Sequence, residues 1–244
     1  MGSMTTSHLV PDSAPPSLDA LETATSRYLE SLTVLDDAAM RAPALLPGWS
    51  RGHVVTHLAR NADAMVNVLT GARLDEVRAM YPSQEQRNAD IDSGAGRTAE
   101  ELRADAETTC AALMAAARAL AADHWDRPVR RTPEAEPFPA RTVPDARLLE
   151  VEVHHADLGV GYTWERWDGA FADAAITRAQ GEPRELPSAV LRSTDTGGLW
   201  KIGPGEGPEI SGPAGALAWW LLGRGNGAEL VSSAGPVPTL GRWR

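Results

Sequence analysis

The 244 residues include 23 basic and 33 acidic side chains, which gives a net charge of −10 at pH 7. We expect no nucleic-acid or membrane partner, because binding to phosphate or anionic lipid requires a surplus of cations on at least one face. The single cysteine, Cys110, excludes an internal disulfide and any zinc site built from several thiolates, so a metal would be held by histidine and carboxylate. No apolar run reaches the roughly 20 residues of a membrane span, and the given sequence does not start with the basic segment and apolar run of a signal peptide. We therefore expect a cytoplasmic protein.

Residues 1–16 are rich in Ser, Thr and Pro and are expected to be a disordered lead-in, which begins with the expression scar Met1, Gly2 and Ser3. From Leu18 to about Val160 the apolar side chains have helical spacing, and we predict one helical domain over residues 17–165. We predict helices over residues 17–40, 50–71, 98–122 and 144–160, with a less regular piece at 74–95. Four long helices joined by loops indicate a four-helix bundle.

Two helix starts have clear capping signals. Ser50 follows the turn at residues 47–49 and is a typical N-cap. Thr98 is followed three residues later by Glu101, which is the spacing of a capping box. These signals predict that helices begin directly after residues 50 and 98.

After Asp168, glycine and proline become frequent and the pattern changes. Two short runs at 189–194 and 198–202 favour strands, and residues 213–222 favour one helix. We therefore predict a second, small α+β domain over residues 166–244. The expected fold class is mainly α, with a helix bundle followed by a small α/β domain.

The second predicted helix contains a pair of histidines four residues apart, His53 and His57. This spacing suits a metal, but Val54 stands where the zinc-protease motif requires glutamate. At about 100° of rotation per residue, His57 falls beside the apolar stripe of the helix and His53 falls almost opposite it. His57 is therefore the better ligand candidate of the two, although either could be an ordinary surface histidine.

The fourth predicted helix is apolar nearly all round, which predicts that it is buried. Glu150, His154 and Asp157 lie on one narrow arc of this helix. A buried carboxylate and imidazole are costly unless they bond each other or bind a metal. One interpretation is a structural Glu–His hydrogen bond, and the other adds His57 to make an open three-ligand zinc site. Glu152 with His155 is a rival pair of the same residue types.

Five segments of the chain form long motifs in a fixed order: residues 46–64, 80–83 with Arg87, 150–159, 161–163 and 219–225. Together these motifs resemble the mycothiol-dependent maleylpyruvate isomerases, within the wider DinB-like group of metal-binding bundles, and the resemblance covers most of the chain.

The resemblance implies that zinc, or another divalent metal, is held by His57, Glu150 and His154, with mycothiol as the thiol cofactor. It also implies a catalytic role for Arg224 and, more loosely, an anion-handling role for Arg87, both of them also candidates to contact the cofactor. Asp157 is either a support for the metal site or a helix-end residue. Cys110 is not needed, and we expect it to be a small buried side chain.

The implied reaction is the cis–trans isomerisation of maleylpyruvate, in which a thiolate adds reversibly to the double bond. The expected partners are therefore a small-molecule thiol and an electrophilic, anionic substrate. Two alternatives stay open: a mycothiol S-transferase acting on another electrophile, and a DinB-like bundle that binds metal without turnover. The sequence does not determine the oligomeric state.

Overall fold

The computed structural model describes residues 18–182 and 184–241. The chain forms two compact units, which meet in sequence between Leu158 and Gly159. We expected this boundary at residues 165 and 166, seven residues later. The difference arises because two tryptophans after Gly159 pack within the second unit: the ring of Trp167 meets that of Trp219, and the backbone at Trp164 lies against Gly215. The expected lead-in and scar lie outside the described residues.

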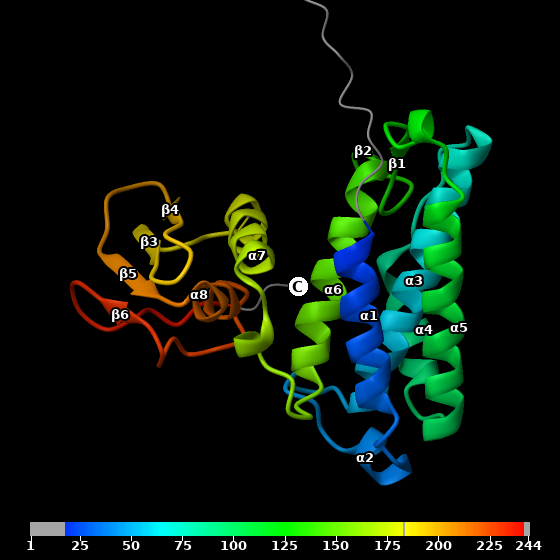
Figure 1. Cartoon of the computed structure of the whole chain (residues 1–244), viewed down its shortest axis with the longest axis horizontal. Helices are drawn as coiled ribbons and strands as arrows, with labels where there is room; N and C mark the ends of the chain where they lie inside the picture. The colour runs from blue at the N-terminus through cyan, green and yellow to red at the C-terminus, as the bar shows by residue number, and fades with distance from the viewer. Residues whose placement is uncertain (1–17, 183, 242–244) are drawn as a thin grey trace, which may run out of the picture. The chain divides into compact units, whose positions relative to one another are not determined.

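The first unit is helical (Figure 1). Its short two-stranded sheet pairs β1 (Pro128–Val129) with β2 (Phe138–Pro139) in antiparallel fashion. Single 3-10 turns occur at Ala122–His124 and Ala140–Thr142. The helices are α1 (Asp19–Leu32), α2 (Asp37–Arg41), α3 (Arg51–Leu74), α4 (Gln84–Gly94), α5 (Ala99–Arg118) and α6 (Val143–Asp157).

Four of these helices make the predicted bundle. α1 packs on α6 and on α5, and α3 packs on α5 and on α6. Apolar side chains from α3, α5 and the start of α6 form a continuous buried cluster that includes Met65, Leu113 and Val143. α6 is buried along most of its length, as its sequence predicted. The predicted fold class is thus confirmed.

The predicted helix boundaries hold best where a cap is present. Ser50 caps α3, and Thr98 with Glu101 forms the capping box of α5. The helix expected over 17–40 is instead two helices, because the chain turns after Leu32 and Asp36 caps α2 by accepting a hydrogen bond from the Ala39 amide. The piece expected to be less regular contains α4, which Ser83 caps.

The second unit combines two helices with a four-stranded sheet in the order β4-β3-β5-β6. β3 pairs antiparallel with β4 and parallel with β5, while β6 is antiparallel to β5. A 3-10 turn at Trp164–Arg166 precedes the first helix. The elements are α7 (Gly169–Gly181), β3 (Ala189–Ser193), β4 (Leu199–Ile202), β5 (Glu209–Gly212), α8 (Ala214–Leu221) and β6 (Val231–Ser232).

The prediction of one helix in this unit was wrong, because α7 is a second one. Asp168 caps α7 by accepting from the Phe171 amide, and Phe171, Ala175 and Ile176 form its buried side. These residues have helical spacing, but glycine and proline are frequent in the rest of the unit, and that composition favoured loops and strands over a second helix. α7 packs closely on α8.

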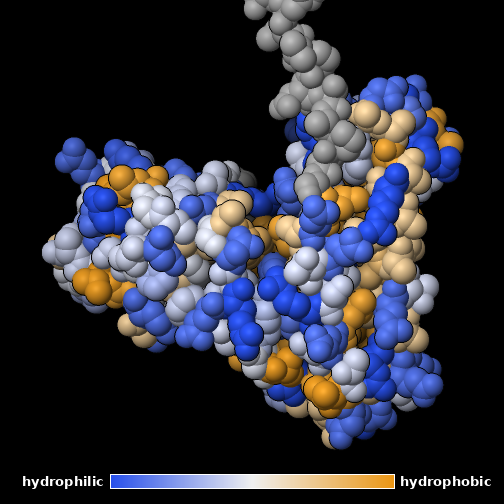
Figure 2. Space-filling model, in the orientation of Figure 1, coloured by the Kyte–Doolittle hydropathy of each residue, from blue (hydrophilic) through white to orange (hydrophobic). Residues whose placement is uncertain are grey.

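On the face shown in Figure 2, the hydrophobic residues of the helical unit occur in small groups separated by hydrophilic ones. Within residues 18–158, the large exposed apolar side chains are Val34, Leu45, Leu74 and Val77. Among the described residues, no helix is both long and apolar enough to cross a membrane.

Candidate metal centre

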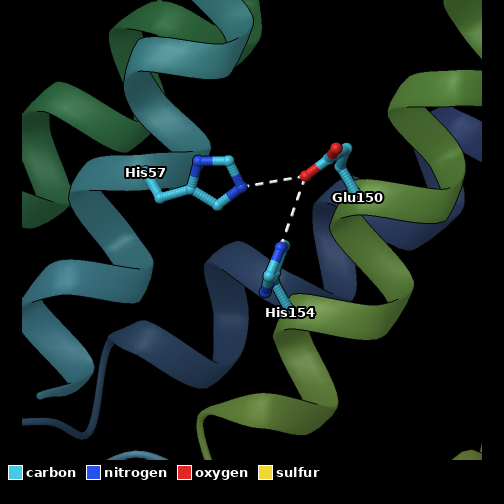
Figure 3. A group of neighbouring side chains, drawn as sticks. All are labelled: His57, Glu150 and His154. Carbon is cyan, nitrogen blue, oxygen red and sulfur yellow. Dashed lines mark hydrogen bonds and ion pairs between the residues drawn. The ribbon is translucent and has the colours of Figure 1, made fainter. Parts of the chain in front are cut away.

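Three side chains from two helices of the bundle converge on one point (Figure 3). His57 comes from α3, and Glu150 and His154 lie one turn apart on α6. Oε2 of Glu150 is 2.8 Å from Nε2 of His57 and 3.3 Å from Nε2 of His154. One potential ligand atom from each residue lies within 4.8 Å of the others. The structure thus brings together the three residues that the sequence analysis selected.

Burial and mutual contact shift the pKa values of this cluster. Burial, helped by the nearby His154, lowers the pKa of His57 to about 4, so His57 is neutral at pH 7. Burial alone would raise the pKa of Glu150, but hydrogen bonds from His154 and His57 outweigh it and hold that pKa well below its usual value. The centre therefore contains a carboxylate between two imidazoles.

Asp157 supports the cluster from the last turn of α6. Its side chain is fully buried, and its Oδ2 lies 2.9 Å from Nδ1 of His154. Burial alone would lower the pKa of His154, but the bonds to Asp157 and Glu150 raise it. The Nδ1–H of His154 is directed at Asp157 and its Nε2–H at Glu150. A metal bound at Nε2 would replace only the second proton, and the Nδ1–H to Asp157 is the carboxylate–histidine arrangement common behind metal ligands.

Arg87 of α4 contacts the other histidine. Its Nη2 lies 3.1 Å from Nδ1 of His57. A guanidinium has donors only, so Nδ1 accepts this bond and the proton of His57 is on Nε2, directed at Glu150. A metal bound at Nε2 would need that proton on Nδ1, where it would meet another donor. Arg87 must therefore move when His57 takes a metal.

The donor set itself fits a divalent metal. Two imidazoles and one carboxylate on a rigid pair of helices form the three-ligand set of catalytic zinc sites, which leaves one coordination position open. His57, Glu150 and His154 are the residues that would hold the ion.

Trp49 is a neighbour of the cluster that sequence reasoning missed. Its indole lies in the turn before α3, half-buried, and its centroid is 5.7 Å from that of His57 and 6.5 Å from that of His154. It also stacks on His53. The sequence signal that could have found it is its position directly before the N-cap Ser50, because the residue before a cap packs close to the first turn of the helix.

The alternative candidates have other partners. Nδ1 of His53 lies 2.7 Å from the Ser50 hydroxyl and accepts from the Ser50 amide at 3.2 Å, and so closes the start of α3. Its side chain is about a quarter exposed, at 26%. His53 is therefore less solvated than its position opposite the apolar stripe predicted, because it folds back onto the cap.

The rival pair on α6 faces α1. Glu152 accepts from Arg27 at 2.7 Å, and Nε2 of His155 lies 2.8 Å from the hydroxyl of Ser31. Burial, with the nearby charge of Arg27, lowers the pKa of His155 to about 4. These residues join α1 to α6, and neither Glu152 nor His155 belongs to the metal-capable group found among the described residues.

Two further residues from the sequence analysis lie elsewhere. Cys110 is buried in α5, as expected, where it lies 3.5 Å from a guanidinium nitrogen of Arg147. Arg224 lies in the second unit, just after α8, and donates to the carbonyl of Leu222 at 3.1 Å. Its functional role stays a prediction.

The fold and the cluster together define a class: a helix-bundle protein with a buried His–Glu–His group suited to a divalent metal, followed by a small α/β unit. Residues 21–159 match the family described as the mycothiol maleylpyruvate isomerase N-terminal domain. The chain belongs to this family.

Solved structures agree with the family match. The chain is similar to the crystal structure of a mycothiol-dependent maleylpyruvate isomerase, with 28% identity and a TM-score of 0.85 over 93% of this chain and 95% of that one. A histidine-to-alanine mutant of the mycothiol-dependent maleylpyruvate isomerase matches equally well. The comparison with curated proteins found no match. Because the likeness spans both units, it supports an enzyme of this family and not a bundle alone.

Proposed function

We propose that this protein is a mycothiol-dependent cis–trans isomerase of the maleylpyruvate type. The observation that carries the proposal is the cluster of His57, Glu150 and His154, in a chain similar over 93% of its length to a solved enzyme of that name. The proposed partners are mycothiol and an unsaturated, anionic substrate, and the proposed location is the cytoplasm.

Each residue of the first unit that lies at the site has a separate proposed role. His57, Glu150 and His154 would hold zinc, and the bound ion would supply an open position at which a thiol could be deprotonated near neutral pH. Glu150 contributes the negative charge of the ligand set, and Asp157 keeps His154 turned so that Nε2 faces the centre. Trp49 lies beside both histidine rings, with its indole against each of them.

The net charge of −10 would repel an anionic substrate, so we propose that two arginines, Arg87 and Arg224, attract it locally. Once released from His57, Arg87 can donate to a substrate carboxylate beside the centre. We also propose that Arg224 donates to the substrate or to the charge that develops on it during the reaction.

The deciding experiment incubates the zinc-loaded protein with mycothiol and maleylpyruvate and identifies the product. Fumarylpyruvate without incorporated thiol is the result expected of the isomerase. A stable thioether would instead identify an S-transferase. Bound zinc without a thiol-dependent reaction on any electrophile tested would favour a non-catalytic metal-binding protein.

A further inference from the structure

Beside the metal-capable cluster, two arginines lie against one aromatic ring. The guanidinium carbon of Arg87 is 5.8 Å from the centroid of the Tyr81 ring, and that of Arg131 is 5.7 Å from it. Arg87 comes from α4 and Arg131 follows β1, so separate segments of the first unit each place a guanidinium against the same ring. Two positive charges this close to one ring repel each other, and an anion that contacts both would reduce that cost.

Tyr81 is held in place by contacts other than those with the two guanidinium groups. Its side chain is buried, and its hydroxyl accepts from Nδ2 of Asn61 at 3.4 Å. Asn61 lies one turn after His57 on α3 and accepts from the buried Arg147 at 2.7 Å. The Tyr81 amide also donates to the carbonyl of Arg131 at 3.0 Å. The ring is thus a fixed support close to the cluster.

Both guanidinium groups have N–H groups that could donate to a ligand. Nε of Arg87 is buried without a hydrogen-bond partner, and one of its terminal nitrogens bonds only the neighbouring Asn88. Arg131 is exposed, and within the part of the chain described by the structure its guanidinium makes no ion pair or hydrogen bond. A buried donor without an acceptor costs free energy, so Nε of Arg87 is a place where a ligand acceptor would be stabilising.

We propose that Arg87 and Arg131, supported by Tyr81, form a subsite for a dianionic ligand with two carboxylates. Arg87 takes the carboxylate nearer the metal-capable cluster, and Arg131 takes the distal one. Arg131 is thus a specificity-determining residue that distinguishes dicarboxylates from monocarboxylates. The assignment of this dianion as the substrate rests on the proposed function.

The test is isothermal titration calorimetry of the zinc-loaded full-length protein, without thiol, using maleate and the monocarboxylate crotonate. We expect maleate to bind more tightly than crotonate. Arg131→Gln should weaken maleate binding about tenfold, equivalent to about 1.4 kcal/mol, and leave crotonate binding unchanged. Arg73→Gln, which removes an exposed arginine at the end of α3, is the matched control and should change neither.

Three results would overturn the subsite: no binding of maleate by the unmodified protein, equal binding of maleate by Arg131→Gln, or an equal loss for both ligands, which would indicate a general field effect. Because no thiol or turnover is involved, this test is separate from that of the proposed function. Selective loss of maleate binding together with no isomerase activity would retain the subsite and reject the function.

Discussion

His57 has two ring nitrogens, and each contacts a different charged neighbour. Nε2 is directed at Glu150 and Nδ1 at Arg87. The proton has to change nitrogen when a metal takes Nε2, and only an acceptor at Nδ1 would stabilise the new arrangement. Arg87 therefore favours the tautomer of His57 with the proton on Nε2, the nitrogen that a metal would take.

We expect Arg87→Gln to increase zinc affinity about tenfold, or about 1.4 kcal/mol. The amide oxygen of glutamine can accept from Nδ1–H, and the positive charge next to the metal is removed. Competition with a chelating dye measures the dissociation constant, with Arg131→Gln as a control that keeps the contact to His57. A weaker affinity in Arg87→Gln would mean that the guanidinium supports the metal and does not oppose it.

Arg224 is the residue whose role the sequence resemblance assigns most directly to catalysis. Because Arg224 is not one of the proposed metal ligands, Arg224→Lys should leave the zinc content unchanged and lower kcat in the isomerase assay about tenfold or more. Lysine keeps the charge but loses the planar pair of donors. Metal analysis and steady-state kinetics on the same preparation check both parts, and an unchanged kcat would remove Arg224 from the reaction.

Among the helices, α3 and α4 come unusually close at two glycines. A Cβ at Gly52 would collide with the carbonyl oxygen of Ala95, and one at Gly94 would lie 2.6 Å from a side-chain carbon of Thr56. This contact fixes the helix that contains Arg87 against the helix that contains His57. The element pair, and not either helix alone, positions the guanidinium.

Gly52→Ala should lower the free energy of unfolding by about 1 to 3 kcal/mol, the usual cost of overpacking a tight contact. Urea denaturation measures this change. Gly96→Ala is the matched control, because a Cβ at Gly96 meets nothing within 4 Å. Equal stability of the two variants would show that α4 adjusts its position freely.

In the second unit, the turn after β3 caps α8. Oδ1 of Asp195 accepts from the Ala214 amide at 2.9 Å, the Thr196 amide at 3.0 Å and the Ser193 hydroxyl at 2.7 Å. Burial alone would raise the pKa of Asp195, but these hydrogen bonds outweigh it and lower the pKa. The folded protein therefore favours the ionised carboxylate.

This shift predicts a pH-dependent stability difference. The contribution of ionised Asp195 is complete above its unfolded pKa of about 4 and is lost as the pH falls through the lower folded value. Asp195→Ala should cost about 1 kcal/mol at pH 7, a typical value for a lost helix cap. Urea midpoints of the wild type and the variant should converge as the pH falls below 4, and a constant gap would contradict the assignment.

At the scale of the whole molecule, a metal that binds only the folded chain must stabilise it. We expect about one zinc per chain and an increase in Tm, with a gain of about 2.7 kcal/mol when free zinc is a hundredfold above its dissociation constant. Chelation should reverse the increase. Calorimetry with metal analysis measures both quantities.

Histidine variants identify the ligands behind this effect. His57→Ala should lose the zinc and the shift in Tm, whereas His53→Ala, one turn earlier on the same helix, should keep both at a small cost in helix capping. The opposite pattern, with loss in His53→Ala alone, would show that the cluster is not the metal site.

The fold class and helix starts could be predicted because their causes are local. Apolar spacing and the side chains of Ser50 and Thr98 act within one or two turns of the chain. Three features were harder to predict: the helices α4 and α7, and the bend that follows Leu32. Their apolar patterns are short and lie near turn-forming residues. Tertiary packing decides whether such weak segments form helices.

The sequence by itself determined that Glu150, His154 and Asp157 share one arc of a buried helix, because helical rotation sets their relative directions. Only the tertiary structure decided what that arc faces: α3 with His57, while Glu152 and His155 face α1. It also placed Trp49 and Arg87 beside the histidines. The physical reason is that rotation along one helix specifies directions around its own axis, whereas the choice of facing helix depends on how all the apolar stripes pack together.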